Sequence, residues 1–100
     1  MLTRIFIILK DDNEENELRV KSKIKEISDK LSYSPSRNSP YSMGVDFYAA
    51  GDLTRDEFDD VSKKLTDFYI GDYNSYSARS FNAKLFDESI EEIQVEYFDD

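Results

Sequence analysis

The sequence has no cysteine, no histidine and no tryptophan among its 100 residues, and only 3 glycines and 2 prolines. Without cysteine there is no disulfide, no thiolate nucleophile and no cysteine-based zinc site. Because a secreted domain of this size usually needs disulfides, their absence favours the cytoplasm. The longest apolar run, Ile5–Leu9, is too short for a membrane span or a signal-peptide core. We therefore expect a cytoplasmic chain with no targeting segment and no membrane partner.

The missing residue types also remove most of the usual catalytic groups. Without histidine and cysteine, only carboxylates, lysine, serine and tyrosine remain as bases or nucleophiles. No Gly-rich phosphate loop, nucleophile elbow or zinc motif is present. The acidic segment 11–17 is not a calcium loop, because Asn16 stands where that loop needs glycine. The sequence predicts a non-enzyme without metal or cofactor; a small carboxylate-dependent enzyme is the least favoured of three hypotheses.

The residues that are present suit one folded domain. Hydrophobic residues make up 39% of the chain and aromatic residues 14%, which is enough for a core despite 35% charged residues. A length of 100 residues is that of one ordinary domain. We expect residues 1–100 to form a single acidic α/β domain.

The net charge of minus 9 is unevenly distributed along the chain. Residues 1–45 hold 8 Lys or Arg against 7 Asp or Glu, whereas residues 46–100 hold 5 against 15. A negative protein is repelled by nucleic acid and by anionic membranes. A basic protein is therefore the expected partner, and direct binding of nucleic acid is not expected.

The first half of the chain predicts a strand, a helix and a second strand. Residues 2–9 are apolar on both faces, which is typical of a central strand covered on both sides or lying beside a parallel neighbour. Caps at Asp11–Asn13 predict the start of a helix. Its apolar stripe consists of Val20, Ile24, Ile27 and Leu31. Residues 32–42, rich in Ser and Pro, predict an irregular connection, and residues 43–50 alternate as a half-buried strand that ends at Gly51.

The second half begins with the clearest local signal. Thr54 and Glu57 form a capping-box pattern, and Leu53 with Phe58 form a hydrophobic staple. The predicted helix has the apolar stripe Phe58, Val61, Leu65 and Phe68. Its end is predicted at Gly71.

Two further strands should close the fold as a hairpin. Residues 77–86 place Phe81, Ala83 and Leu85 on one face, residues 87–89 form a turn, and Ile93 and its alternate neighbours face inward in the last strand. The order β-α-β-α-β-β predicts a two-layer α/β sandwich. Both helices should cover one face of a mixed four-stranded sheet, in an arrangement that approaches the ferredoxin-like fold.

Ten residues are candidates for partner binding. Acids on the second helix and on the outer face of the last strand could display charge as a nucleic-acid backbone does, and the tyrosine-rich loop has the composition of a recognition surface. The candidates are Asp56, Asp59, Asp60, Asp67, Asp72, Tyr69, Tyr73, Tyr76, Glu92 and Glu96.

Each of these groups also has an alternative interpretation. The acids could merely solvate exposed faces or protect a sheet edge from pairing with other chains. The tyrosine rings could pack over the end of the second helix with their hydroxyls in water. The lysines of the first helix are interleaved with acids, which is typical of a solvated face, although they could also pair with a second copy in a head-to-tail dimer.

In size, charge and lack of catalytic groups, the chain resembles the small acidic proteins of phages and mobile elements, such as anti-CRISPR and anti-restriction proteins. That resemblance implies an inhibitor that occludes the basic nucleic-acid-binding surface of a host defence or nucleic-acid-processing protein, as a DNA mimic does. The alternative hypothesis is a structural or oligomerising module whose acids serve solubility, with Phe86 and Phe98 at its interface.

Overall fold

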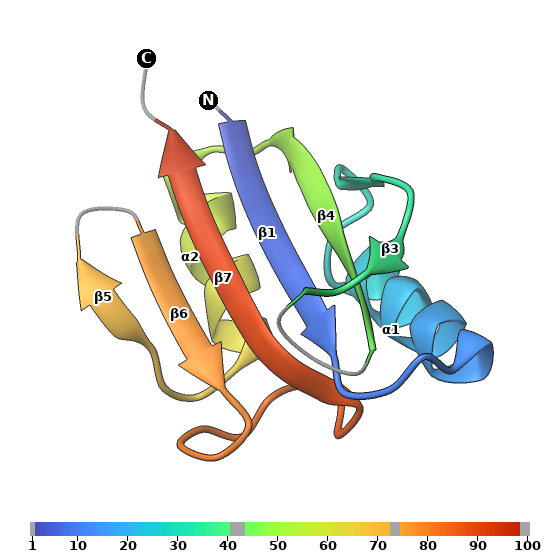
Figure 1. The fold of residues 1–100 in the computed structure, drawn as a ribbon. Coiled ribbons are helices and arrows are strands. Elements are labelled where there is room, and N and C mark those ends of the chain that lie inside the picture. Colours follow the sequence, from blue (N-terminus) through green and yellow to red (C-terminus); the bar gives the residue numbers. More distant parts are fainter. Residues whose placement is uncertain (1, 41–43, 73–74, 99–100) are drawn as a thin grey trace.

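The computed structural model describes residues 2–40, 44–72 and 75–98. Within these ranges the chain forms two helices packed against one seven-stranded sheet (Figure 1). Neither helix in this part of the chain is long and apolar enough to cross a membrane. The predicted two-layer arrangement of helices and sheet is confirmed.

The first strand and helix lie close to their predicted positions. Strand β1 is Leu2–Leu9 and helix α1 is Glu14–Ile27. The side chain of Asn13 caps α1 by accepting a hydrogen bond from the backbone N–H of Asn16 at 3.0 Å. The helix ends at Ile27, so the prediction that Leu31 belongs to it was wrong. Leu31 is nevertheless fully buried, because the connection folds back over the core.

The connection after α1 is more ordered than predicted. Two short strands, β2 (Ser32–Tyr33) and β3 (Arg37–Asn38), both pair with β4 (Val45–Asp52). The expectation of a wholly irregular connection was therefore wrong, since strands of two residues are too short to show a period in sequence. Met43, where the second strand was expected to begin, lies outside the described residues.

Helix α2 (Arg55–Leu65) has the predicted start and a different end. The Thr54 hydroxyl accepts from the N–H of Glu57 at 3.2 Å, and the Glu57 carboxylate accepts from the N–H of Thr54 at 2.9 Å. The helix stops at Leu65, because Thr66 is extended and forms an isolated β-bridge with Leu85. The predicted end at Gly71 was wrong.

The end of the chain contributes three strands instead of the predicted two. They are β5 (Ile70–Asp72), β6 (Ser75–Arg79) and β7 (Ile90–Phe98). The predicted strand over residues 77–86 was wrong beyond Arg79, because residues 80–89 form a connection in which Phe81 is exposed. Gly71, expected to stop a helix, instead lies within the β5–β6 hairpin.

All strand pairs in the described sheet are antiparallel, and the order is β2-β4-β1-β7-β6-β5, with β3 also beside β4. The prediction of a mixed sheet of four strands was wrong, because both neighbours of β1 run antiparallel to it. The ferredoxin-like arrangement is not confirmed. Figure 1 shows β1 and β7 side by side at the centre, with their outer ends near the two chain termini.

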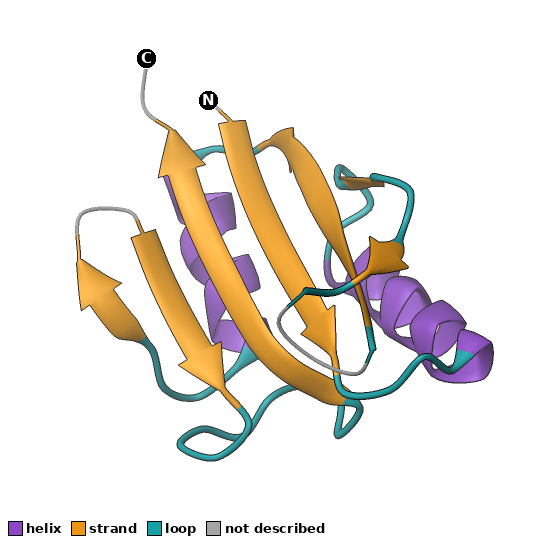
Figure 2. Ribbon diagram, in the orientation of Figure 1, coloured by secondary structure: helices purple, strands orange, loops and turns teal. Residues whose placement is uncertain are grey.

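The core lies between one sheet face and the helices. Residues at odd positions of β1, β4 and β7 pack there with Val20 and Ile24 of α1 and Phe58 and Val61 of α2. Figure 2 shows both helices on the same side of the sheet. No described helix lies over the other face. The prediction that β1 is buried on both faces is nevertheless confirmed at Phe6 and Ile8, which are only 5% and 3% exposed there. We call this face, which has no helix over it, the open face.

Candidate functional site

Of the four exposed acids predicted on the second helix, Asp67 lies beyond its end, and two of the other three form ion pairs on the helix itself. Asp59 lies 3.4 Å from Arg55, and Asp60 lies 3.0 Å from Lys64. Asp56 is exposed in the first turn. Exposed pairs four residues apart contribute only about 0.3–0.5 kcal/mol. Their main effect is to reduce the negative charge that α2 displays.

Four of the predicted residues line one cavity of about 360 Å³ beside the end of α2. Asp59, Asp67, Tyr69 and Tyr76 all line it. The Tyr69 hydroxyl donates to the carbonyl oxygen of Ser62 at 2.6 Å, and its ring meets that of Tyr76 edge-on with centroids 6.1 Å apart. Burial raises the pKa of Tyr69, so its hydroxyl stays a neutral donor.

Two further predicted residues, Glu92 and Glu96, do not line this cavity. Glu92 and Glu96 lie on the open face of β7, where Glu92 is 2.6 Å from Arg79 and Glu96 is 3.0 Å from Arg4. The side chain of Asp72 and all of Tyr73 lie outside the described part of the chain. Of the two phenylalanines considered for an interface, Phe98 is exposed and Phe86 packs against the core.

Cations of the first half pair with acids of the second half across the fold. The charge asymmetry of the sequence is therefore used in part inside the molecule, as ion pairs between distant segments. The pairs are Arg4–Glu96 at 3.0 Å, Lys30–Glu57 at 2.5 Å, Arg37–Asp46 at 2.7 Å, Arg19–Asp87 at 2.8 Å and Lys23–Asp87 at 2.9 Å.

A row of paired charges crosses the open face from strand to strand. The register aligns Arg79 with Glu92, Glu92 with Ile8, Ile8 with Asp46, and Asp46 with Arg37. An Arg–carboxylate pair thus stands on each side of one isoleucine. The Asp46 side chain is almost completely buried beneath its arginine. These pairs present arginine side chains to solvent while compensating the acids below them.

Aromatic side chains occupy the adjacent positions. Phe6 and Tyr48 have ring centroids 4.6 Å apart, and the Arg4 guanidinium lies 5.2 Å from the ring centroids of both Tyr48 and Phe98. Four exposed apolar side chains lie on this face or at its rim. They are Leu2 (46% exposed), Tyr48 (37%), Phe81 (75%) and Phe98 (39%).

The open face is also hollowed. A cavity of about 510 Å³ is lined by Phe6, Tyr48 and Phe81 together with Arg37 and Arg79. Its walls therefore combine aromatic rings with charged groups held by carboxylates. Within the described residues, no three acids converge in a way that could hold a metal ion.

Sequence reasoning missed the aromatic and arginine part of this face. The burial of Phe6 and Ile8 was expected from the apolar run, but their place beside Tyr48 and the arginines was not. Arg79 and Phe81 were both placed on one predicted strand, whereas β6 ends at Arg79. Tyr48 was available as a signal, since it stands at an outward position of an alternating strand. The cross-strand rows depend on register, which no pattern within a single strand reveals.

Comparison with known proteins finds no protein-family model that matches the chain, and no curated protein or solved structure matches it significantly.

Proposed function

We propose that this chain is a non-catalytic protein-binding domain that docks a basic partner protein on the open face of its sheet. The observation that carries the proposal is the gathering of Leu2, Tyr48, Phe81 and Phe98, all more than a third exposed, on or beside the open face. Monomeric proteins rarely leave such a group of large apolar side chains together unless a partner covers it.

The composition of the open face supports protein binding. Arginine, tyrosine and phenylalanine are enriched in the centres of protein interfaces, where they supply most of the binding free energy. Arg4 is held between Tyr48 and Glu96, and Arg79 between Phe81 and Glu92. Because these contacts already restrict the arginine side chains, little entropy is lost when a partner packs on them.

The charge of the whole molecule supports a basic partner. A net charge of minus 9 accelerates encounters with positively charged surfaces and slows those with acidic ones. Proteins that handle nucleic acid carry such surfaces. We therefore propose an inhibitor or adaptor that covers part of a nucleic-acid-handling protein, in the manner of inhibitors carried by phages against host defence complexes.

The test is capture of partners on the protein attached through one engineered cysteine. S22C on the exposed side of α1 gives a unique attachment point in a chain without native cysteine. We compare F81S, which removes an exposed ring from the open face, with F68S, which removes an exposed ring elsewhere. A third arm, D56N with D60N, changes the acidic surface of α2.

We expect capture of a basic protein that salt and nucleic acid displace. F68S should capture as much of it as the unsubstituted protein does, whereas F81S should capture at least ten-fold less. A partner retained by F81S and lost by D56N with D60N would move the interface to α2 and overturn the proposed docking surface. Capture of only the chain itself, with light scattering showing a dimer that F81S abolishes, would replace the proposal with self-association.

A further inference from the structure

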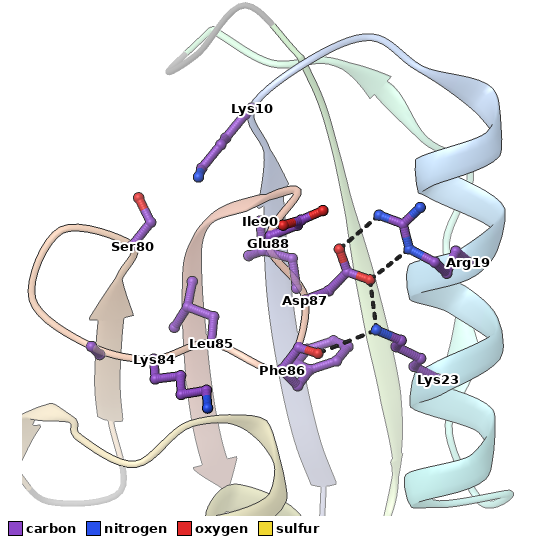
Figure 3. A pocket seen from close by; sticks show the side chains of 11 residues that line it. Lys10, Arg19, Lys23, Ser80, Lys84, Leu85, Phe86, Asp87, Glu88 and Ile90 are labelled. Carbon is purple, nitrogen blue, oxygen red and sulfur yellow. Dashed lines mark hydrogen bonds and ion pairs between the residues drawn. The ribbon is translucent and has the colours of Figure 1, made fainter.

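A cavity of about 480 Å³ lies apart from the open face, between α1 and the connection 80–89. Figure 3 shows side chains from three segments around it: Lys10 after β1, Arg19 and Lys23 from α1, and Ser80 and Lys84 from the connection. Four cations and two acids, Asp87 and Glu88, line the cavity, so the charge of its lining side chains is plus 2. The pocket is positive on a molecule whose net charge is minus 9.

Asp87 organises one wall of this pocket. Its side chain is only 1% exposed and accepts from Arg19 Nε at 2.8 Å and Nη2 at 3.0 Å, and from Lys23 Nζ at 2.9 Å. It also accepts from the N–H and the hydroxyl of Ser89, at 2.9 and 2.7 Å. The carboxylate thereby holds two cations in place and compensates only one positive charge.

The other two cations lack a compensating acid. Within the described residues, the side chains of Lys10 and Lys84 have no hydrogen bond or ion pair. Their backbones are nevertheless held: the N–H of Lys10 donates to Ser89 at 2.9 Å, and the N–H of Lys84 donates to Asp67 at 3.0 Å. The two ammonium groups are thus anchored at their base and available to a ligand.

We propose that this pocket binds a small phosphate-bearing ligand. Lysine ammonium groups bind phosphate as point charges, and the Arg19 guanidinium adds directed donors. A phosphate group carries more than one negative charge and so matches the local excess, whereas a single carboxylate matches half of it. Leu85 and Phe86 give the cavity an apolar wall, which suits an organic group attached to the phosphate. The described lining of this pocket shares no residue with that of the open-face cavity.

The experiment is a titration of the full chain followed by NMR of backbone amides, at constant ionic strength. The probes are phenyl phosphate, inorganic phosphate and benzoate, with NaCl as the ionic reference. We expect saturable shifts at Lys10, Lys84 and Ser89 with both phosphates, and none with benzoate at the same concentration. Tighter binding of phenyl phosphate assigns the site to phosphate esters; equal binding assigns it to free phosphate.

The variant K10Q with K84Q should weaken phosphate binding at least ten-fold. K63Q removes an exposed lysine of α2 that does not line this pocket, and should bind as the wild type does. Shifts that NaCl reproduces, or equal affinity of K10Q/K84Q and wild type, would overturn the proposal. Unchanged amide spectra of the free variants show that they are folded, so a loss of binding then reports on the pocket.

Discussion

Asp87 shows how a single residue links the last connection of the chain to its first helix. The hydrogen bond from Arg19 is the main cause that holds the pKa of Asp87 far below its ordinary value, with Ser89 and Lys23 adding to it. A carboxylate with a lowered folded-state pKa contributes stability above its unfolded pKa of about 3.9 and loses it as the pH falls below that value.

We expect D87N to lower the free energy of unfolding by about 1.5–3 kcal/mol at pH 7, the range for hydrogen bonds to charged groups. Urea unfolding followed by circular dichroism measures this. The difference from wild type should shrink as the pH falls below about 3.9, because the carboxylate is then protonated in the unfolded state while it stays ionised in the folded state. E26Q, an exposed change on α1, serves as control and should alter stability by less than about 0.5 kcal/mol. A D87N effect independent of pH would contradict the charge argument.

Gly71 is a second residue on which local structure depends. Its φ of +142° is rarely adopted by residues with a side chain, and a Cβ there would lie 2.2 Å from the carbonyl oxygen of Ser75. We expect G71A to destabilise the chain by about 1–3 kcal/mol, the cost of a strained backbone. Thermal unfolding measures the change. S75A, which keeps that carbonyl, should have little effect; an equal loss in both variants would contradict the steric explanation.

At the scale of elements, the capping box of α2 was predictable because both partners lie within one turn of sequence. T54A should cost about 1 kcal/mol, the usual value for loss of such a cap. S22A, a control that removes an exposed hydroxyl from the middle of α1, should leave the stability unchanged. Chemical unfolding of both variants tests the difference, and equal stability of T54A and wild type would show that α2 does not depend on its cap.

The stability that Glu57 of this capping box contributes depends on pH. The hydrogen bond from Lys30, together with the N–H of Thr54, lowers the pKa of Glu57 from 4.5 to about 2. Its contribution to stability is therefore present above pH 4.5 and is lost as the pH falls toward 2. E57Q should remove this part of the acid sensitivity. Urea midpoints of wild type and E57Q, measured between pH 6 and pH 2, should converge at the acid end.

The elements that sequence reasoning misplaced share a physical cause. Helix starts, the long strands β1, β4 and β7 and their inward faces follow from local periodicity and caps. The end of α2 does not, because Thr66 leaves the helix to bridge Leu85, nineteen positions later. The short strands β2, β3 and β5 exist only by pairing with longer ones. The part of the candidate site that lies on α2 was predictable from the sequence. The rows of charged residues on the open face were not, because they depend on strand register.

At the scale of the whole molecule, long-range repulsion competes with short ion pairs. The excess of nine negative charges acts across extents of 34 × 26 × 22 Å, whereas the ion pairs span 2.5–3.4 Å. The Debye length falls from about 10 Å at 0.1 M salt to about 3 Å at 1 M. Salt should therefore screen the repulsion more than the pairs.

We expect Tm to rise by roughly 2–5 °C between 0.05 and 0.5 M NaCl, which corresponds to about half a kcal/mol or somewhat more for a domain of this size. Differential scanning calorimetry in a buffer without phosphate measures it, since phosphate would add the stabilisation expected of a ligand. A fall in Tm would show that the attraction of the ion pairs between the two halves of the chain outweighs the repulsion due to its net charge.

The pairing of β1 with β7 places Leu2 directly opposite Phe98. A short peptide linker could therefore join the two ends of the described sheet without disturbing the core. New ends opened at the exposed residue Asn82 would give a circular permutant with the same sheet. In such a molecule β7 would be synthesised immediately before β1, and the central strand pair of the fold would change from the most distant contact along the chain to a local hairpin.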